Sequence, residues 1–161
     1  MAAAKLKIDF FIIGATARDI FFSEIFGIKT IRASIDCDLA IRVRSWQEYE
    51  SLLKELLKDN RFQKEEKTFH RFLFQKNTYL DIIPFGAIAN HSNKIQWPPD
   101  FRIIMSVMGF EEAYRASITI RLSDKSFGEV KICSPAGLAV MKIISWSNSY
   151  PIRNQDAKDL L

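Results

Sequence analysis

Apolar residues recur along the chain in two patterns, one typical of strands and one typical of helices. Short apolar or alternating runs predict strands, whereas apolar residues three and four positions apart predict helices. Strands are expected at 7–14, 34–43, 67–75, 78–85, 101–108, 116–122 and 129–133. Helices are expected at 15–26, 45–60 and 134–147, with a further helix beginning in the tail at 154–161. The segment 86–100, which contains Pro98 and Pro99, is expected to be a loop.

Local signals at the ends of these elements support the boundaries. Ser45 and Glu48 have the spacing of a capping box, which predicts that a helix begins directly after Ser45. Only Lys76 and Asn77 separate two of the expected strands, so these strands are expected to form a hairpin across a two-residue turn.

The order of the elements predicts the fold class. Strands and helices mix without strict alternation, which is typical of an α+β (mixed α/β) fold with a mixed β-sheet flanked by helices. A chain of 161 residues is long enough to bury a substantial core in one unit. We therefore expect a single domain over 1–161, with a C-terminal helical segment from residue 134.

Charge and composition narrow the range of partners only slightly. The formal net charge is +4, and the basic residues are spread along the chain, which mildly favours anionic partners such as nucleotides or RNA. No run approaches the roughly 20 apolar residues of a membrane span. Cys37 and Cys133 lie in apolar strand-like runs, as buried thiols do, so the protein is expected to be cytoplasmic.

Two carboxylates interrupt the apolar strand expected at 34–43. Asp36 and Asp38 project from the same face of such a strand and repel each other, and a divalent cation between them would offset this cost. Asp81 is a third acid in an apolar strand, and polymerase-type sites with two metal ions use several carboxylates. The alternative is that Asp36 and Asp38 lie on a solvated face at the edge of a sheet.

The first junction between a strand and a helix offers a place for phosphate. Gly14 allows the backbone to approach a ligand closely, and Ala15, Thr16 and Ala17 then open a helix whose unpaired amides can bind an anion. Arg18, one helical turn later, either reaches that anion or pairs with a nearby acid. The alternative is a tight turn with Arg18 in a surface salt bridge.

Taken together, these segments resemble a known superfamily. The order "IIGATARDIFF", "SIDCDLAI" and "LDIIPFG" is similar to that of the nucleotidyltransferases that include DNA polymerase beta and the tRNA CCA-adding enzymes. The C-terminal stretch "SPAGLAVMKIISWSNSYPIRNQDAKDLL" looks like the helical segment of the AbiEii-type toxin branch. The resemblance implies a nucleotidyltransferase-like fold and transfer of a nucleoside monophosphate from an NTP to an acceptor hydroxyl.

The resemblance also assigns roles to individual residues. It implies that Asp36 and Asp38 ligate two Mg²⁺ ions, and that Asp81 binds the catalytic metal and helps to deprotonate the attacking hydroxyl. Gly14 to Thr16 would cradle the NTP phosphates, and Lys142 would reach the same phosphates from the C-terminal helix. The acceptor would be RNA or tRNA, a protein or a small molecule, and a toxin-like role would bring an antitoxin partner.

Two departures from the family pattern keep other functions open. Ala15 stands where the family has a second glycine or a serine, and Gln155 stands where the AbiEii-type pattern has a lysine. One alternative is a catalytically degenerate member that binds a nucleotide or a protein partner. Another is a metal-dependent nuclease that uses the same carboxylates with water as the attacking group.

The remaining aromatic and histidine residues are expected to have mainly structural roles. Trp46 and Trp146 are expected to pack in the core, and Trp97 is the one tryptophan that we consider for stacking on a ligand. His70 is expected to be a partly exposed strand residue, and His91 a solvated loop residue.

Overall fold

The computed structural model describes residues 2–28, 36–122 and 128–149. The helices in this part of the chain are α1 (Ala2–Leu6), α2 (Gly14–Asp19), the π-helical segment η1 (Ile20–Ile25), α3 (Trp46–Leu56), α4 (Phe110–Arg115) and α5 (Pro135–Ser149). The strands are β1 (Asp9–Ile13), β2 (Cys37–Arg42), β3 (Phe62–Lys64), β4 (Arg71–Phe74), β5 (Thr78–Phe85), β6 (Lys94–Trp97), β7 (Ile103–Ser106), β8 (Ile118–Arg121) and β9 (Glu129–Ile132).

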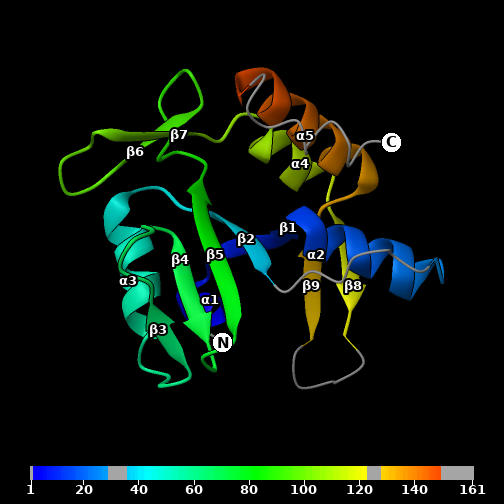
Figure 1. Cartoon of the computed structure of the whole chain (residues 1–161), viewed down its shortest axis with the longest axis horizontal. Helices are drawn as coiled ribbons and strands as arrows, with labels where there is room; N and C mark the ends of the chain where they lie inside the picture. The colour runs from blue at the N-terminus through cyan, green and yellow to red at the C-terminus, as the bar shows by residue number, and fades with distance from the viewer. Residues whose placement is uncertain (1, 29–35, 123–127, 150–161) are drawn as a thin grey trace.

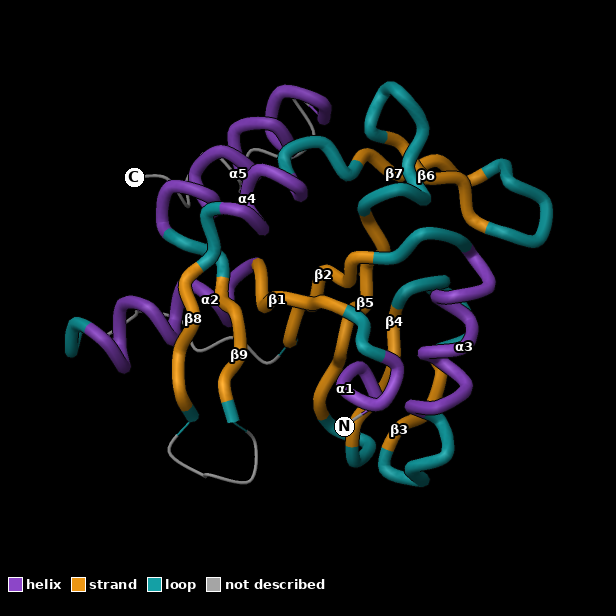
Figure 2. The backbone as a smooth tube through the Cα atoms, turned by 180° about the vertical axis from the view of Figure 1, so that it is seen from behind, coloured by secondary structure: helices purple, strands orange, loops and turns teal. Residues whose placement is uncertain are grey.

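Seven of the described strands form one mixed sheet in the order β3-β4-β5-β2-β1-β9-β8. β2 runs parallel to β5, and β1 runs parallel to β9, while the other neighbours are antiparallel. β6 and β7 pair as a separate hairpin. Figures 1 and 2 show α3 beside β3 to β5, and α4 with α5 at one end of the sheet near β8 and β9.

The core lies between the sheet and these helices. Phe11 of β1 is fully buried and packs edge-to-face against Phe85 and Tyr114, with ring centroids 5.7 and 5.6 Å apart. On the α3 side, the buried hydroxyl of Tyr49 donates a hydrogen bond of 3.0 Å to the carbonyl oxygen of Ile82 in β5. This bond fixes α3 against β5, so β5 is held by neighbours in the sheet and by a helix across it.

The mixed fold class expected from the sequence is confirmed, with a few differences in the elements. The expected helix 15–26 is continuous, but it turns from α-helix to π-helix at Ile20. The loop expected at 86–100 is wrong in part, because Lys94–Trp97 is a strand in which Ile95 and Trp97 are buried in alternation. α1 and α4 were not predicted. The expected helix at 154–161 lies outside the described residues.

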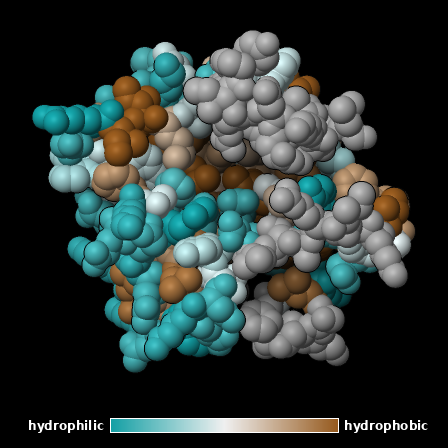
Figure 3. All heavy atoms as spheres, in the orientation of Figure 1, coloured by the Kyte–Doolittle hydropathy of each residue, from teal (hydrophilic) through white to brown (hydrophobic). Residues whose placement is uncertain are grey.

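The coloured part of the face in Figure 3 is largely hydrophilic, with hydrophobic side chains gathered over the β6–β7 hairpin. Ile103 and Ile104 of β7 are among the exposed apolar residues. Of the helices in the described part of the chain, none combines the length and the apolar character needed to cross a bilayer.

Candidate functional site

The central parallel strand pair brings two of the expected acids side by side. Asp38 of β2 and Asp81 of β5 are direct partners in the register of this pair. Partners at the same level of two parallel strands project from the same face of the sheet, so the two carboxylates face the same space. Asp36 immediately precedes β2 and adds a third acid at the start of this strand.

The electrostatic environment of Asp38 shows which groups surround it. Burial, followed by the charges of Asp81 and Asp36, raises the pKa of the Asp38 carboxyl to about 6. Arg71 and Lys142 act in the opposite direction and lower this pKa. Two further acids and two basic groups, one of them from α5, therefore lie within electrostatic range of Asp38, and the sequence had indicated Asp36, Asp81 and Lys142 among them.

Asp36, Asp38 and Asp81 form what we call the acid cluster, and the start of α2 contacts this cluster directly. Gly14 follows Ile13, which is the register partner of Asp38 in the β1–β2 pair. Its φ is +65°, and a Cβ atom placed on it would overlap the carboxylate oxygen Oδ2 of Asp38. Glycine is therefore needed here for two reasons, the left-handed backbone and the space taken by the Asp38 side chain.

A hydrogen bond ties the same helix start to the chain before β2. The hydroxyl Oγ1 of Thr16 donates to the carbonyl oxygen of Asp36 at 2.8 Å. No side chain caps the N-terminus of α2, and Ala15 is only partly buried in its first turn. Thr16 therefore positions Asp36 relative to α2, a structural role that the sequence did not indicate.

Replacing Gly14 by alanine tests this packing. We expect Gly14→Ala to lower the free energy of unfolding by about 1–2 kcal/mol from backbone strain alone, with an added loss because Asp38 must move. Gly27→Ala is the matched control, because Gly27 has φ +66° and no atom lies within 4 Å of the position that a methyl group would take there. Urea denaturation of both variants measures the difference, and equal losses would contradict a contact between Gly14 and Asp38.

An arginine that the sequence did not single out completes the cluster. Arg71 of β4 is the register partner of Asp81 in the antiparallel β4–β5 pair. Its Nε donates to Oδ1 of Asp81 at 2.7 Å, and its Nη2 donates to Oδ2 at 2.8 Å. The guanidinium also lies over the ring of Tyr79, 4.9 Å from its centroid. Both oxygens of the buried Asp81 carboxylate are thus held by one residue.

His70 lies next to this ion pair and connects it to Trp97. Nε2 of His70 is 3.8 Å from Oδ2 of Asp81, and burial keeps the pKa of the imidazole below its usual value. His70 in turn contacts the ring of Trp97. Trp97, the tryptophan considered for stacking on a ligand, is only 2% exposed and also packs against Trp46 and Tyr49, so it is a core residue.

Two more of the expected residues have defined surroundings. Arg18 donates from Nε and Nη2 to Oδ1 of Asp19, at 3.0 and 2.8 Å, which matches the ion-pair alternative considered for it. Lys142 lies on α5, and its charge acts on Asp38. Gln155 lies outside the described residues.

The acid cluster has the donor chemistry of a magnesium site but not the closed geometry of one. Carboxylate oxygens are the ligands that Mg²⁺ prefers, and the partly buried Asp38 beside two further acids is an environment that a cation would stabilise. Among the described residues, however, no three histidine, cysteine, aspartate or glutamate side chains are grouped so that they could hold a metal ion. The Asp81 carboxylate is instead paired with Arg71.

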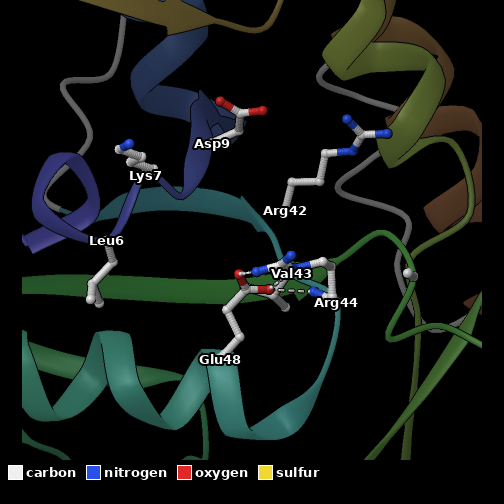
Figure 4. Close-up of a pocket in the computed structure, with 8 residues that line it drawn as sticks. Leu6, Lys7, Asp9, Arg42, Val43, Arg44 and Glu48 are labelled. Carbon is white, nitrogen blue, oxygen red and sulfur yellow. Dashed lines mark hydrogen bonds and ion pairs between the residues drawn. The ribbon is translucent and has the colours of Figure 1, made fainter.

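A separate pocket lies at the other end of the same strands. It has a volume of about 620 Å³, and its lining includes Asp9 and Arg42, register partners at the end of the β1–β2 pair away from Asp38. Figure 4 shows that Arg44 and Glu48, which also line it, are paired with each other. This pocket does not include the acid cluster.

Comparison with known proteins adds information about the fold. No protein-family model matches the chain, and no curated protein matches it by sequence. Among solved structures, it is similar to an antigenic nucleotidyltransferase-like protein from Paracoccidioides brasiliensis, with 19% identity and a TM-score of 0.58. This match covers 98% of the present chain and 67% of the other. The chain has a nucleotidyltransferase fold.

A second solved structure has the same nucleotidyltransferase fold. It is ANT(2″)-Ia in complex with adenylyl-2″-tobramycin, which is 14% identical, with a TM-score of 0.51. The match covers 94% of the present chain and 74% of the other. The fold expected from the sequence resemblance is therefore confirmed by structural similarity.

Proposed function

We propose that this chain is a magnesium-dependent nucleotidyltransferase that moves a nucleoside monophosphate from an NTP to an acceptor hydroxyl. One observation carries the proposal. Asp38 and Asp81 are register partners on adjacent parallel strands, directly beside the glycine that opens α2, within a nucleotidyltransferase fold. Acids in this position, next to a helix start, suit a reaction in which a cation and a polyphosphate must be held together.

The acids supply the proposed metal site. Asp36 and Asp38 would hold two Mg²⁺ ions together with Asp81, and bound metal ions would stabilise the negative charge that develops on the phosphates. Asp81 would in addition accept the proton of the attacking hydroxyl. Burial of Asp38 beside two other acids supports this assignment, because such a cluster is costly unless cations compensate it.

The start of α2 and one helix across the site supply the proposed nucleotide contacts. The amides from Gly14 to Thr16 would bind the β- and γ-phosphates, since no side chain caps this helix. Arg18 and Lys142 would add positive charge, and the influence of Lys142 on Asp38 supports its placement near these phosphates. The protein would contribute mainly positioning and charge neutralisation, which account for most of the catalysis of such transfers.

The acceptor is the least defined part of the proposal. RNA or tRNA, a protein and a small molecule all present hydroxyl groups, and the fold neighbour bound to adenylyl-2″-tobramycin supports a small molecule. A toxin-like role with an antitoxin partner rests on the sequence resemblance at the C-terminus alone. An assay of transfer therefore has to include all three classes of acceptor.

Two observations favour a second candidate. Arg71 already neutralises Asp81, and no three-ligand metal group is formed among the described residues. Both features would suit a catalytically degenerate member of the fold that binds a nucleotide or a partner without transferring anything.

A label-transfer assay tests the proposal. The protein is incubated with each α-³²P-labelled NTP, Mg²⁺, and total RNA, a protein extract or a panel of hydroxylated small molecules. We expect label in one acceptor class, dependence on Mg²⁺, and no transfer from γ-³²P-labelled NTP. RNA cleavage without NTP would instead identify a metal-dependent nuclease, and nucleotide binding without transfer would identify the degenerate member.

A further inference from the structure

The ion pair between Arg71 and Asp81 occupies a place where the proposed function needs a metal ligand. β4 and β5 lie side by side in the sheet (Figure 1), and their register puts these two residues opposite each other. Asp81 is 6% exposed, and its two oxygens accept hydrogen bonds of 2.7 and 2.8 Å from one guanidinium. An oxygen held in this way has less electron density to offer a metal ion.

Arg71 also acts on the whole cluster. The pKa of its guanidinium is raised, first by the hydrogen bonds to Asp81 and further by the charges of Asp36 and Asp38. The ring of Tyr79 also contacts the guanidinium in a cation–π arrangement. The arginine is therefore a fixed positive charge among three acids, which is the electrostatic role that a divalent cation would have there.

We propose that Arg71 is a resident counter-cation of the acid cluster, which competes with a divalent metal ion for the carboxylate of Asp81. This inference rests on the proposed function, because it requires that Asp38 and Asp81 bind metal. Metal binding would then require the guanidinium to release at least one oxygen of Asp81, which would become free to act as a ligand. The ion pair keeps the buried Asp81 neutralised before metal arrives, and it lowers the affinity for metal.

A purely structural ion pair would behave differently. Removing its arginine would leave Asp81 buried and uncompensated, and the protein would lose stability in any solution. If Arg71 competes with metal, its removal also lowers stability when no metal is present. In this case, however, the removal raises metal affinity, and added metal restores the lost stability. The two explanations differ in measurements that do not involve the transfer reaction.

Mn²⁺ binding to the whole chain, followed at pH 7.5 by electron paramagnetic resonance of the free ion, is the direct test. We expect Arg71→Gln to raise Mn²⁺ affinity on the order of 10- to 100-fold, because a charge-assisted hydrogen-bonded pair no longer has to be broken before the metal binds. Arg61→Gln is the matched control, because Arg61 makes a similar two-pronged pair with Asp59 on the surface. This control should bind Mn²⁺ with the affinity of the unmodified protein.

Thermal unfolding supplies the second readout. Arg71→Gln is expected to have a lower Tm than the unmodified protein in EDTA, and Mn²⁺ should raise the Tm of this variant more than that of the unmodified protein. Arg71→Lys retains the positive charge but cannot make the two parallel hydrogen bonds of the guanidinium. It replaces the glutamine variant in both measurements if that variant does not fold. We expect its Mn²⁺ affinity to lie between those of the other two proteins.

The outcomes separate this inference from the proposed function. If Mn²⁺ binds the unmodified protein, Asp38→Asn weakens that binding, and Arg71→Gln leaves it unchanged, the competition is refuted while the metal site stands. If Arg71→Gln loses stability that Mn²⁺ does not restore, the ion pair is structural and the inference is also refuted. If none of the variants binds Mn²⁺, both the inference and the metal-dependent function fall.

Discussion

Asp38→Asn is expected to lower the rate of nucleotide transfer by about a thousandfold or more, because a neutral amide removes a charge that the proposed metal site requires. Asp38 is the centre of the cluster, and Asp81, Asp36, Arg71 and Lys142 all act on it. The loss should appear in kcat at saturating NTP and Mg²⁺ in the label-transfer assay. Added Mg²⁺ should not restore it, since the affected group would bind the metal itself.

Asp9→Asn is the control for this loss. Asp9 lies on the exposed end of β1, opposite Arg42 and away from Asp38. This variant removes one carboxylate from a neighbouring strand without touching the acid cluster, so it should retain full transfer. Transfer that survives Asp38→Asn would refute the assigned site, even if the chain proves to be a nucleotidyltransferase.

The same Asp38→Asn variant is expected to be more stable than the unmodified protein at neutral pH in EDTA. The pKa of Asp38 rises from 3.8 to about 6 in the folded chain, so the folded state binds a proton that the unfolded state releases. The stability of the unmodified protein should therefore fall as pH rises from about 4 through about 6. Above pH 7, ionisation of Asp38 should lower the free energy of unfolding by about 3 kcal/mol. The asparagine variant avoids this loss.

Urea denaturation between pH 4 and pH 8, with EDTA present, measures this difference. The gain in free energy of unfolding should be near zero at pH 4, grow across the interval between the two pKa values, and stay constant above pH 7. A gain that is independent of pH would mean that the asparagine improves packing and that Asp38 titrates normally.

The sequence was sufficient to assign the acids to strands and the glycine to a junction between a strand and a helix, because local hydrophobic patterns define these elements. Asp38 and Asp81 are charges inside apolar runs, and the strands that contain them are recognisable from those runs alone. The helix that begins after Gly14 follows from the same periodicity. That β2 and β5 pair in parallel, with these two acids at one level, comes only from the three-dimensional structure.

Arg71 was missed because its partner depends on the length of one turn. A two-residue turn at Lys76 and Asn77 would have placed Phe72 opposite Asp81. The structure instead pairs Phe74 with Thr78 across three residues, with Gln75 and Lys76 both at positive φ. The shift of one residue brings Arg71 opposite Asp81, and a strand pattern does not predict such a shift when neither turn residue is glycine.

The pairing of β2 with β5 also determines which changes in chain length the site can accept. The two acids are separated by one inter-strand spacing, about 4.8 Å in a β-sheet, and neither depends on a loop for its position. Inserting or deleting one residue inside either strand would rotate its acid to the far side of the sheet. Homologues of this chain should therefore vary in the length of the connections around these strands and hold the strands themselves at constant length.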